Sequence, residues 1–120
     1  MKYFLIILGG ATGTICRVLI SDLVERTQFL LFPLGIIFVN IFGCFLLGIL
    51  INFLSPKYEE IYQPLLLMGF LGAFTTFSAF SKETFQLIEQ GNWIVVIAYV
   101  FVTVIGCLVS TWLGMQISNN

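Results

Sequence analysis

The chain has 120 residues, of which five are basic, six are acidic and none is histidine. Hydrophobic side chains make up 59% of it, and the mean hydropathy is +1.06. Soluble domains carry roughly a quarter of their residues as charged side chains, so this composition excludes an ordinary soluble domain and also a disordered chain. The net charge of −1 gives no basic patch for nucleic acid, so we expect no nucleic-acid partner, and the length indicates a single domain, residues 1–120.

The charged residues occur in short clusters that leave long apolar stretches between them. The three longest stretches begin after Arg26, Glu60 and Glu89, and each can hold a membrane span of about 20 residues. A further span at the N-terminus has to include Arg17. We therefore predict an all-α integral membrane protein with four transmembrane helices. The predicted spans are 3–24, 32–54, 61–88 (interrupted) and 93–116.

Small residues in the first span predict where it packs. Gly9, Gly10 and Gly13 allow a close approach of helix backbones in lipid, so we expect all three on one packing face. A cleaved signal peptide is the competing interpretation of this stretch, because Lys2 is followed by an apolar run with small residues.

The basic residues outside the spans divide evenly between the two sides of the membrane. Four spans place both termini and the second loop on one side, with Lys2 and Lys57. The first and third loops, with Arg26 and Lys82, lie on the other side. The positive-inside bias is therefore close to zero, and such a chain can insert in both orientations. We predict an antiparallel, dual-topology homodimer with two-fold symmetry, although counts this small also arise by chance.

The third span contains the strongest candidate for a functional segment, GFLGAFTTFSAFSKE at 69–83. Its glycines, threonines and serines form helix poorly, so we expect the helix to break in the middle of the membrane, between Gly72 and Thr76. Backbone carbonyls freed by a break coordinate Na⁺ in some transporters. The alternative is a kinked helix whose freed groups are bonded by Thr and Ser hydroxyls.

The phenylalanines of this segment are candidates for an ion path. Phe74, Phe77 and Phe80 follow one another at three-residue spacing, so we expect them to line one side of the helix or of its broken continuation. Phenylalanine normally indicates packing. The edge of its ring is, however, the positive part of the aromatic quadrupole, and such edges can contact an anion weakly enough for conduction.

Polar side chains inside the other spans are further candidates, because polar groups in hydrocarbon are costly. Asn40 in the second span can donate two hydrogen bonds to an anion or can join two helices. One face of the fourth span carries polar residues at every fourth position: Tyr99, Thr103, Cys107 and Thr111. These side chains can solvate an ion along a path, or they can form hydrogen bonds between helices.

Other chemistries find no support in the sequence. The three cysteines lie in three different predicted spans, without the ligand spacing of a zinc site. No phosphate-binding loop and no pair of carboxylates within a span occurs. We therefore expect that the protein is not an enzyme.

Three segments closely resemble the Fluc (CrcB-type) fluoride channels. They are GGATG at 9–13 followed by Arg17, VNIFGCFLLG at 39–48, and the segment at 69–83 with its TTFSAF run. The resemblance extends over essentially the whole chain. It implies a fluoride-selective channel in the cell (inner or plasma) membrane that exports the fluoride ion passively, and an antiparallel homodimer in the lipid bilayer with two pores.

The resemblance also implies roles for particular residues. Asn40 would contact the permeating ion, and the ring edges of Phe77 and Phe80 would face it. Backbone carbonyls of Gly72 and Thr75 from both subunits would hold a structural Na⁺ at the dimer centre. The hydroxyl track of the family's fourth helix would correspond to Tyr99, Thr103, Cys107 and Thr111, with Cys107 the weaker donor.

Two other functions are compatible with four short spans. A proton-coupled small multidrug transporter needs a carboxylate within the membrane, and residues 3–16 contain none. A non-transporting accessory subunit would leave Asn40 and the hydroxyls with structural roles only. Arg17, the one full cation within a span, would either draw anions into a vestibule or cap a helix end.

Overall fold

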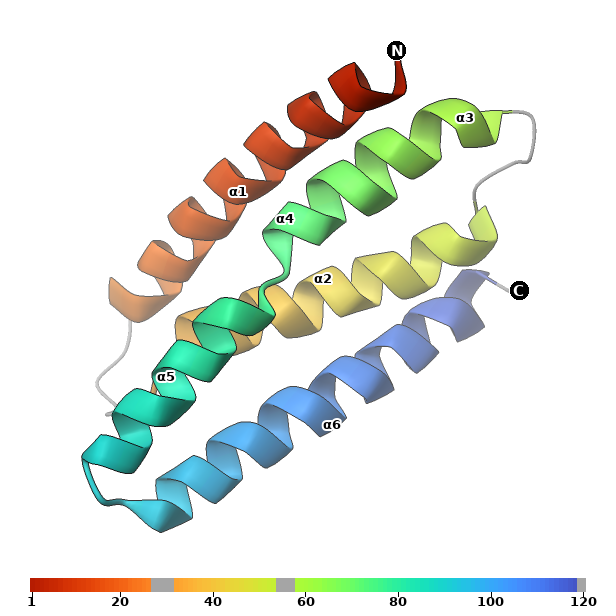
Figure 1. The fold of residues 1–120 in the computed structure, drawn as a ribbon. Helices are drawn as coiled ribbons and strands as arrows, with labels where there is room; N and C mark the ends of the chain where they lie inside the picture. The colour runs from red at the N-terminus through yellow and green to blue at the C-terminus, as the bar shows by residue number, and fades with distance from the viewer. Residues whose placement is uncertain (27–31, 54–57, 119–120) are drawn as a thin grey trace.

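The computed structural model describes residues 1–26, 32–53 and 58–118, and all regular secondary structure within these ranges is helical (Figure 1). The elements are α1 (Lys2–Arg26), α2 (Leu34–Phe53), α3 (Glu59–Tyr62), the π-helical η2 (Gln63–Leu71), α4 (Gly72–Phe74), α5 (Phe77–Glu89) and α6 (Trp93–Ser118).

Four helical runs in the described ranges are long and apolar enough to cross a membrane: Lys2–Arg26, Leu34–Asn52, Glu59–Glu89 and Trp93–Ser118. The predicted four-span, all-α class is confirmed. The second span begins directly after Pro33, two residues later than predicted, and its predicted end at 54 lies outside the described residues.

The helices pack in two close pairs. The first pair is α1 with η2 and α4, and the second is α2 with α6. In the second pair the backbones are in contact, because a Cβ atom on Gly48 would lie 2.2 Å from the carbonyl oxygen of Thr111. On Gly114 it would lie 2.3 Å from the carbonyl oxygen of Phe45.

Glycines of α1 allow the corresponding contact with η2. A Cβ on Gly9 would lie 2.0 Å from the carbonyl oxygen of Leu65, and one on Gly13 would lie 2.2 Å from that of Phe70. Among the described residues, nothing lies within 4 Å of a Cβ placed on Gly10. The predicted packing face is confirmed at Gly9 and Gly13 and is wrong at Gly10, which a helix of 3.6 residues per turn directs away from its neighbour.

These two adjacent glycines provide a matched test of the α1–η2 contact. We expect Gly9→Ala to lower the free energy of unfolding by about 1–3 kcal/mol, because the added methyl group has to displace backbone. Gly10→Ala, whose methyl group meets no neighbour among the described residues, should leave it unchanged or raise it by up to about 1 kcal/mol, because alanine favours the helix over glycine. Thermal unfolding midpoints of the purified variants in detergent measure the difference, and equal midpoints would contradict the packing described here.

The third span is interrupted at Thr75 and Thr76. Both residues are extended, with φ −79° and ψ 150° at Thr75 and φ −152° and ψ 112° at Thr76. Figure 1 shows the chain passing from α4 to α5 through this extended link. Thr76 then caps α5, because its Oγ1 accepts a hydrogen bond of 3.2 Å from the N–H of Ala79.

The two chain termini lie on the same side of the helices, as expected for four membrane crossings. The N-terminus and the end of α6 lie at one end of the helices, and the end of α1 and the α5–α6 turn lie at the other (Figure 1). One position in the charge count is corrected, because Lys82 lies inside α5 and not in the third loop. Lys57, which also entered that count, lies outside the described residues.

Candidate functional site

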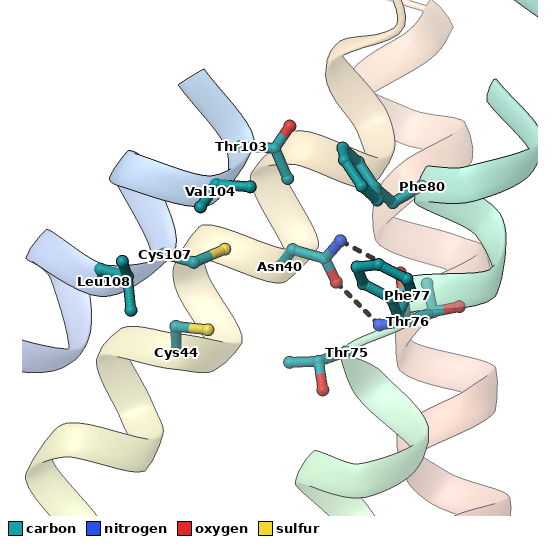
Figure 2. Close-up of a pocket in the computed structure, with 10 residues that line it drawn as sticks. All are labelled: Asn40, Cys44, Thr75, Thr76, Phe77, Phe80, Thr103, Val104, Cys107 and Leu108. Carbon is teal, nitrogen blue, oxygen red and sulfur yellow. Dashed lines mark hydrogen bonds between the residues drawn. The ribbon is translucent and has the colours of Figure 1, made fainter. Parts of the chain in front are cut away.

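A pocket of about 300 Å³ lies beside the helix break (Figure 2). Its walls come from α2, from the break itself, from α5 and from α6. The lining residues are Asn40, Cys44, Thr75, Thr76, Phe77, Phe80, Thr103, Val104, Cys107 and Leu108. None of these described lining residues carries a charge. Segments far apart in the sequence therefore combine amide, hydroxyl, thiol and aromatic groups in one uncharged pocket.

Asn40 binds the break through both ends of its carboxamide. Its Oδ1 accepts a hydrogen bond of 2.7 Å from the N–H of Thr76, and its Nδ2 donates one of 3.2 Å to the carbonyl oxygen of Thr76. The dashed lines in Figure 2 mark both bonds, and both are buried. Because an amide nitrogen carries two hydrogens, one N–H of Asn40 is left for an acceptor in the pocket. Asn40 therefore joins two helices and keeps one donor.

The predicted phenylalanines separate into two environments. Phe77 and Phe80 both line the pocket, with ring centroids 5.3 Å apart and planes at 47°. Phe74 is only 1% exposed and stacks against Phe70 at 5.6 Å, within the core. The prediction that all three line one side is wrong, because the extended Thr75 and Thr76 change the helical phase after Phe74.

Tyr99 of the predicted α6 face supports the pocket from behind. It is fully buried, is not among the described lining residues, and stacks on Phe80 with centroids 5.5 Å apart and planes at 13°. Its hydroxyl donates to the carboxylate of Glu83 on α5. Glu83 could not be recognised as a partner of Tyr99 from the sequence, because α5 and α6 meet only in the folded chain.

The threonines of the α6 face use their hydroxyl hydrogens within α6. Thr103, which lines the pocket, donates to the carbonyl oxygen of Tyr99 at 2.8 Å. Thr111, which is not among the described lining residues, donates to that of Cys107 at 3.0 Å. Since a hydroxyl has one hydrogen, Thr103 has to rotate before it can donate to anything in the pocket.

Of the two residues proposed to bind Na⁺, Gly72 begins α4 just before the break and Thr75 is the first extended residue of the break. In a continuous helix their carbonyl oxygens would accept from the N–H groups of Thr76 and Ala79. The N–H of Thr76 donates to Asn40 instead, and that of Ala79 donates to the Thr76 hydroxyl. Both carbonyls have thus lost their regular helical partners, and carbonyl oxygen is a ligand that hard cations accept.

A second pocket, of about 410 Å³, lies next to the first. Its lining includes the cationic side chains of Arg17 and Lys82 and the hydroxyls of Ser21, Thr76 and Ser78. Thr76 lines both pockets, so they meet at the break. Arg17 lies in the interior of α1, so it does not cap an end of that helix.

These features define a small multi-pass membrane protein with an uncharged pocket at a helix break, and broken helices line the binding sites of many membrane transporters. A family model described as CrcB-like protein, Camphor Resistance (CrcB), matches residues 4–115. The chain belongs to this family, and the resemblance inferred from three segments is confirmed.

Curated relatives match over nearly the full chain. A protein of Coxiella burnetii (strain CbuK_Q154) is 41% identical over 99% of this chain and 98% of its own length. One from Azobacteroides pseudotrichonymphae genomovar. CFP2 is 40% identical over 94% and 92%. One from Citrifermentans bemidjiense is 40% identical over 95% and 94%. All three are named fluoride-specific ion channel FluC. The family is one of ion channels, and this chain is not an enzyme.

Proposed function

We propose that this chain is a fluoride-selective channel through which fluoride leaves the cell passively. The observation that carries the proposal is the uncharged pocket at the break, which combines a free amide N–H of Asn40 with the rings of Phe77 and Phe80. Fluoride is small and strongly hydrated, so a path that strips its water needs such donors in place of hydration. A full positive charge there would hold the ion too tightly for conduction.

The second pocket supplies the approach to this path. Arg17 and Lys82 raise the concentration of anions in it, as clefts lined by one sign of charge do. Thr76 and Ser78 at its inner end offer hydroxyls at hydrogen-bonding distance from each other, 3.1 Å. Fluoride therefore passes from a cationic vestibule to an uncharged constriction beside the break.

The working unit is an antiparallel homodimer of two chains in the cell membrane, with one path per chain and hence two pores. One chain does not enclose its own pocket, because Phe77 remains 77% exposed although it lines the pocket. A second copy in the opposite orientation covers this side. The few basic residues outside the spans, Lys2 and Lys57 against Arg26, impose little preference for one orientation. The helix breaks of the two copies then lie together in the middle of the membrane.

Three lysines added after Asn120 should trap every chain in one orientation, since basic residues are retained on the cytoplasmic side. We expect fluoride efflux from cells expressing this variant to be lost, and to return when an oppositely biased variant is expressed with it. Three serines at the same place serve as the control. Wild-type efflux from the lysine variant alone would exclude the antiparallel dimer.

A structural Na⁺ at the dimer centre is bound by the carbonyl oxygens of Gly72 and Thr75 from both copies. The support is the loss of regular helical partners at both carbonyls. A bound cation would supply positive potential near the anion path without entering it. Elemental analysis of the purified dimer should find one sodium per two chains after exhaustive exchange into potassium buffer, and its absence would exclude a tightly held ion.

Efflux from liposomes measured with a fluoride electrode tests the function itself. A fluoride channel should release fluoride rapidly, with no dependence on a proton gradient and no comparable release of chloride. Dependence on the proton gradient would favour the coupled transporter, and no flux of any halide would favour the accessory subunit.

A further inference from the structure

Two of the three cysteines lie together in the wall of the pocket. Cys44 of α2 and Cys107 of α6 both line it, and their side chains are close neighbours. Figure 2 shows the two sulfur atoms directed toward the pocket from neighbouring helices. Cys16 of α1 is not among the described lining residues, and all three thiols are free. The pair is therefore within reach of small molecules that enter the pocket.

The helices that carry this pair are held close on both sides of it. Ser110 of α6 donates a hydrogen bond of 2.8 Å to the carbonyl oxygen of Ile41 on α2. Further along α2, Gly48 is in backbone contact with α6. On α2, Cys44 lies between these two contacts. On α6, Cys107 follows Gly106, where an added Cβ atom would lie 2.6 Å from Cδ1 of Ile41. A disulfide requires its Cβ atoms within about 4.5 Å, and the close packing of α2 on α6 favours such an approach of Cys44 and Cys107.

We propose that Cys44 and Cys107 form a redox pair that a peroxide oxidises to a disulfide, linking α2 to α6 in the pocket wall. Hydrogen peroxide is small and uncharged, and the pocket of about 300 Å³ admits it, since one water takes about 30 Å³ of the liquid. One thiol attacks the O–O bond and becomes a sulfenic acid as water leaves. The second thiol then displaces a second water and forms the S–S bond. Two thiols lose two hydrogens, and one peroxide is reduced to two waters.

The disulfide also changes the pocket. It removes both S–H donors from the wall and brings the two sulfur atoms to about 2.05 Å from each other. If the pocket is the fluoride path, as proposed above, this change lowers flux. We expect a decrease of roughly tenfold, which corresponds to about 1.4 kcal/mol in the barrier. This effect on flux rests on the proposed function, whereas formation of the disulfide does not.

The experiment follows the bond and the flux separately. The purified dimer in liposomes is treated with hydrogen peroxide or with a phosphine reductant, unfolded, and labelled with a maleimide. Reduced wild type should take three labels, and oxidised wild type should take one, at Cys16, with an intact mass lower by two hydrogens. Cys16→Ser should form the same bond. Cys44→Ser and Cys107→Ser should not form it, and their flux should be insensitive to peroxide relative to their own untreated rates.

The outcomes separate the two proposals. Three labels on peroxide-treated wild type, or added oxygen atoms in place of lost hydrogens, would overturn the redox pair. Formation of the disulfide without a change in fluoride flux would overturn the proposal that the disulfide lowers the flux. If reduced protein shows no fluoride flux, the proposed function fails, while the label count and the mass still decide whether the disulfide forms.

Discussion

Phe77→Ile and Phe80→Ile should each lower fluoride efflux by about a hundredfold, equivalent to about 2.7 kcal/mol in the barrier. Both rings line the pocket, with centroids 5.3 Å apart. Isoleucine fills much of the same space but has no ring, so it cannot present a positive edge to an anion. The measurement is the initial rate of efflux from liposomes, normalised to the amount of reconstituted dimer.

Phe85→Ile is the matched control for these variants. Phe85 lies on α5 as they do, is exposed, and is not among the described residues lining the pocket. Its variant should conduct within about twofold of wild type, less than 0.5 kcal/mol in the barrier. Phe80 is buried and stacks on Tyr99, so Phe80→Ile can also weaken folding. Phe77 is 77% exposed in the single chain, so its replacement disturbs the fold of that chain less. Normal fluoride flux in Phe77→Ile would therefore contradict the proposal that the ring edges contact the permeating ion.

Asn40→Asp should abolish flux. The aspartate retains an oxygen that accepts from the N–H of Thr76, but it has no N–H to donate to the carbonyl of Thr76 or to a passing anion. It also places a carboxylate in a pocket whose described lining is uncharged. Repulsion and the lost donors act in the same direction, so we expect efflux at the level of empty liposomes.

Asn52→Asp, on the same helix, separates this effect from the general effect of a new carboxylate. Asn52 is exposed and is not among the described pocket residues, and its Nδ2 lies 3.5 Å from the carbonyl oxygen of Met115. Its variant should conduct like wild type. Both variants should elute as dimers in size-exclusion chromatography. Wild-type efflux by a dimeric Asn40→Asp protein would show that this amide does not face the ion.

The four spans could be predicted because lipid imposes a simple requirement on composition and length. Charged side chains are costly in hydrocarbon, so the charges near Arg26, Glu60 and Glu89 mark the ends of the spans. The structure places membrane-length helices between them. The break at Thr75 and Thr76 follows the local run of poor helix formers. Such signals depend on neighbours in the sequence, and they can be read without knowledge of the fold.

The geometry of the site depends on contacts between distant segments and could not be predicted in this way. The Asn40 carboxamide was a candidate donor from its type alone, but its two bonds to Thr76 need α2 to lie against the break. The three-residue spacing of the phenylalanines predicted Phe74 on the same side as Phe77 and Phe80, which is wrong because the helix is interrupted between Phe74 and Phe77. The meeting of Cys44 with Cys107 likewise follows from the packing of α2 on α6.

The reversal potential of single-channel current in a planar bilayer tests most directly whether this chain conducts fluoride alone. With a tenfold fluoride gradient and chloride balancing the ionic strength, we expect reversal at the fluoride equilibrium potential, about 59 mV for a monovalent ion. Replacing chloride by another anion, or imposing a pH gradient, should not move it. A reversal potential that follows chloride or protons, or the absence of any fluoride current, would contradict a fluoride-selective channel.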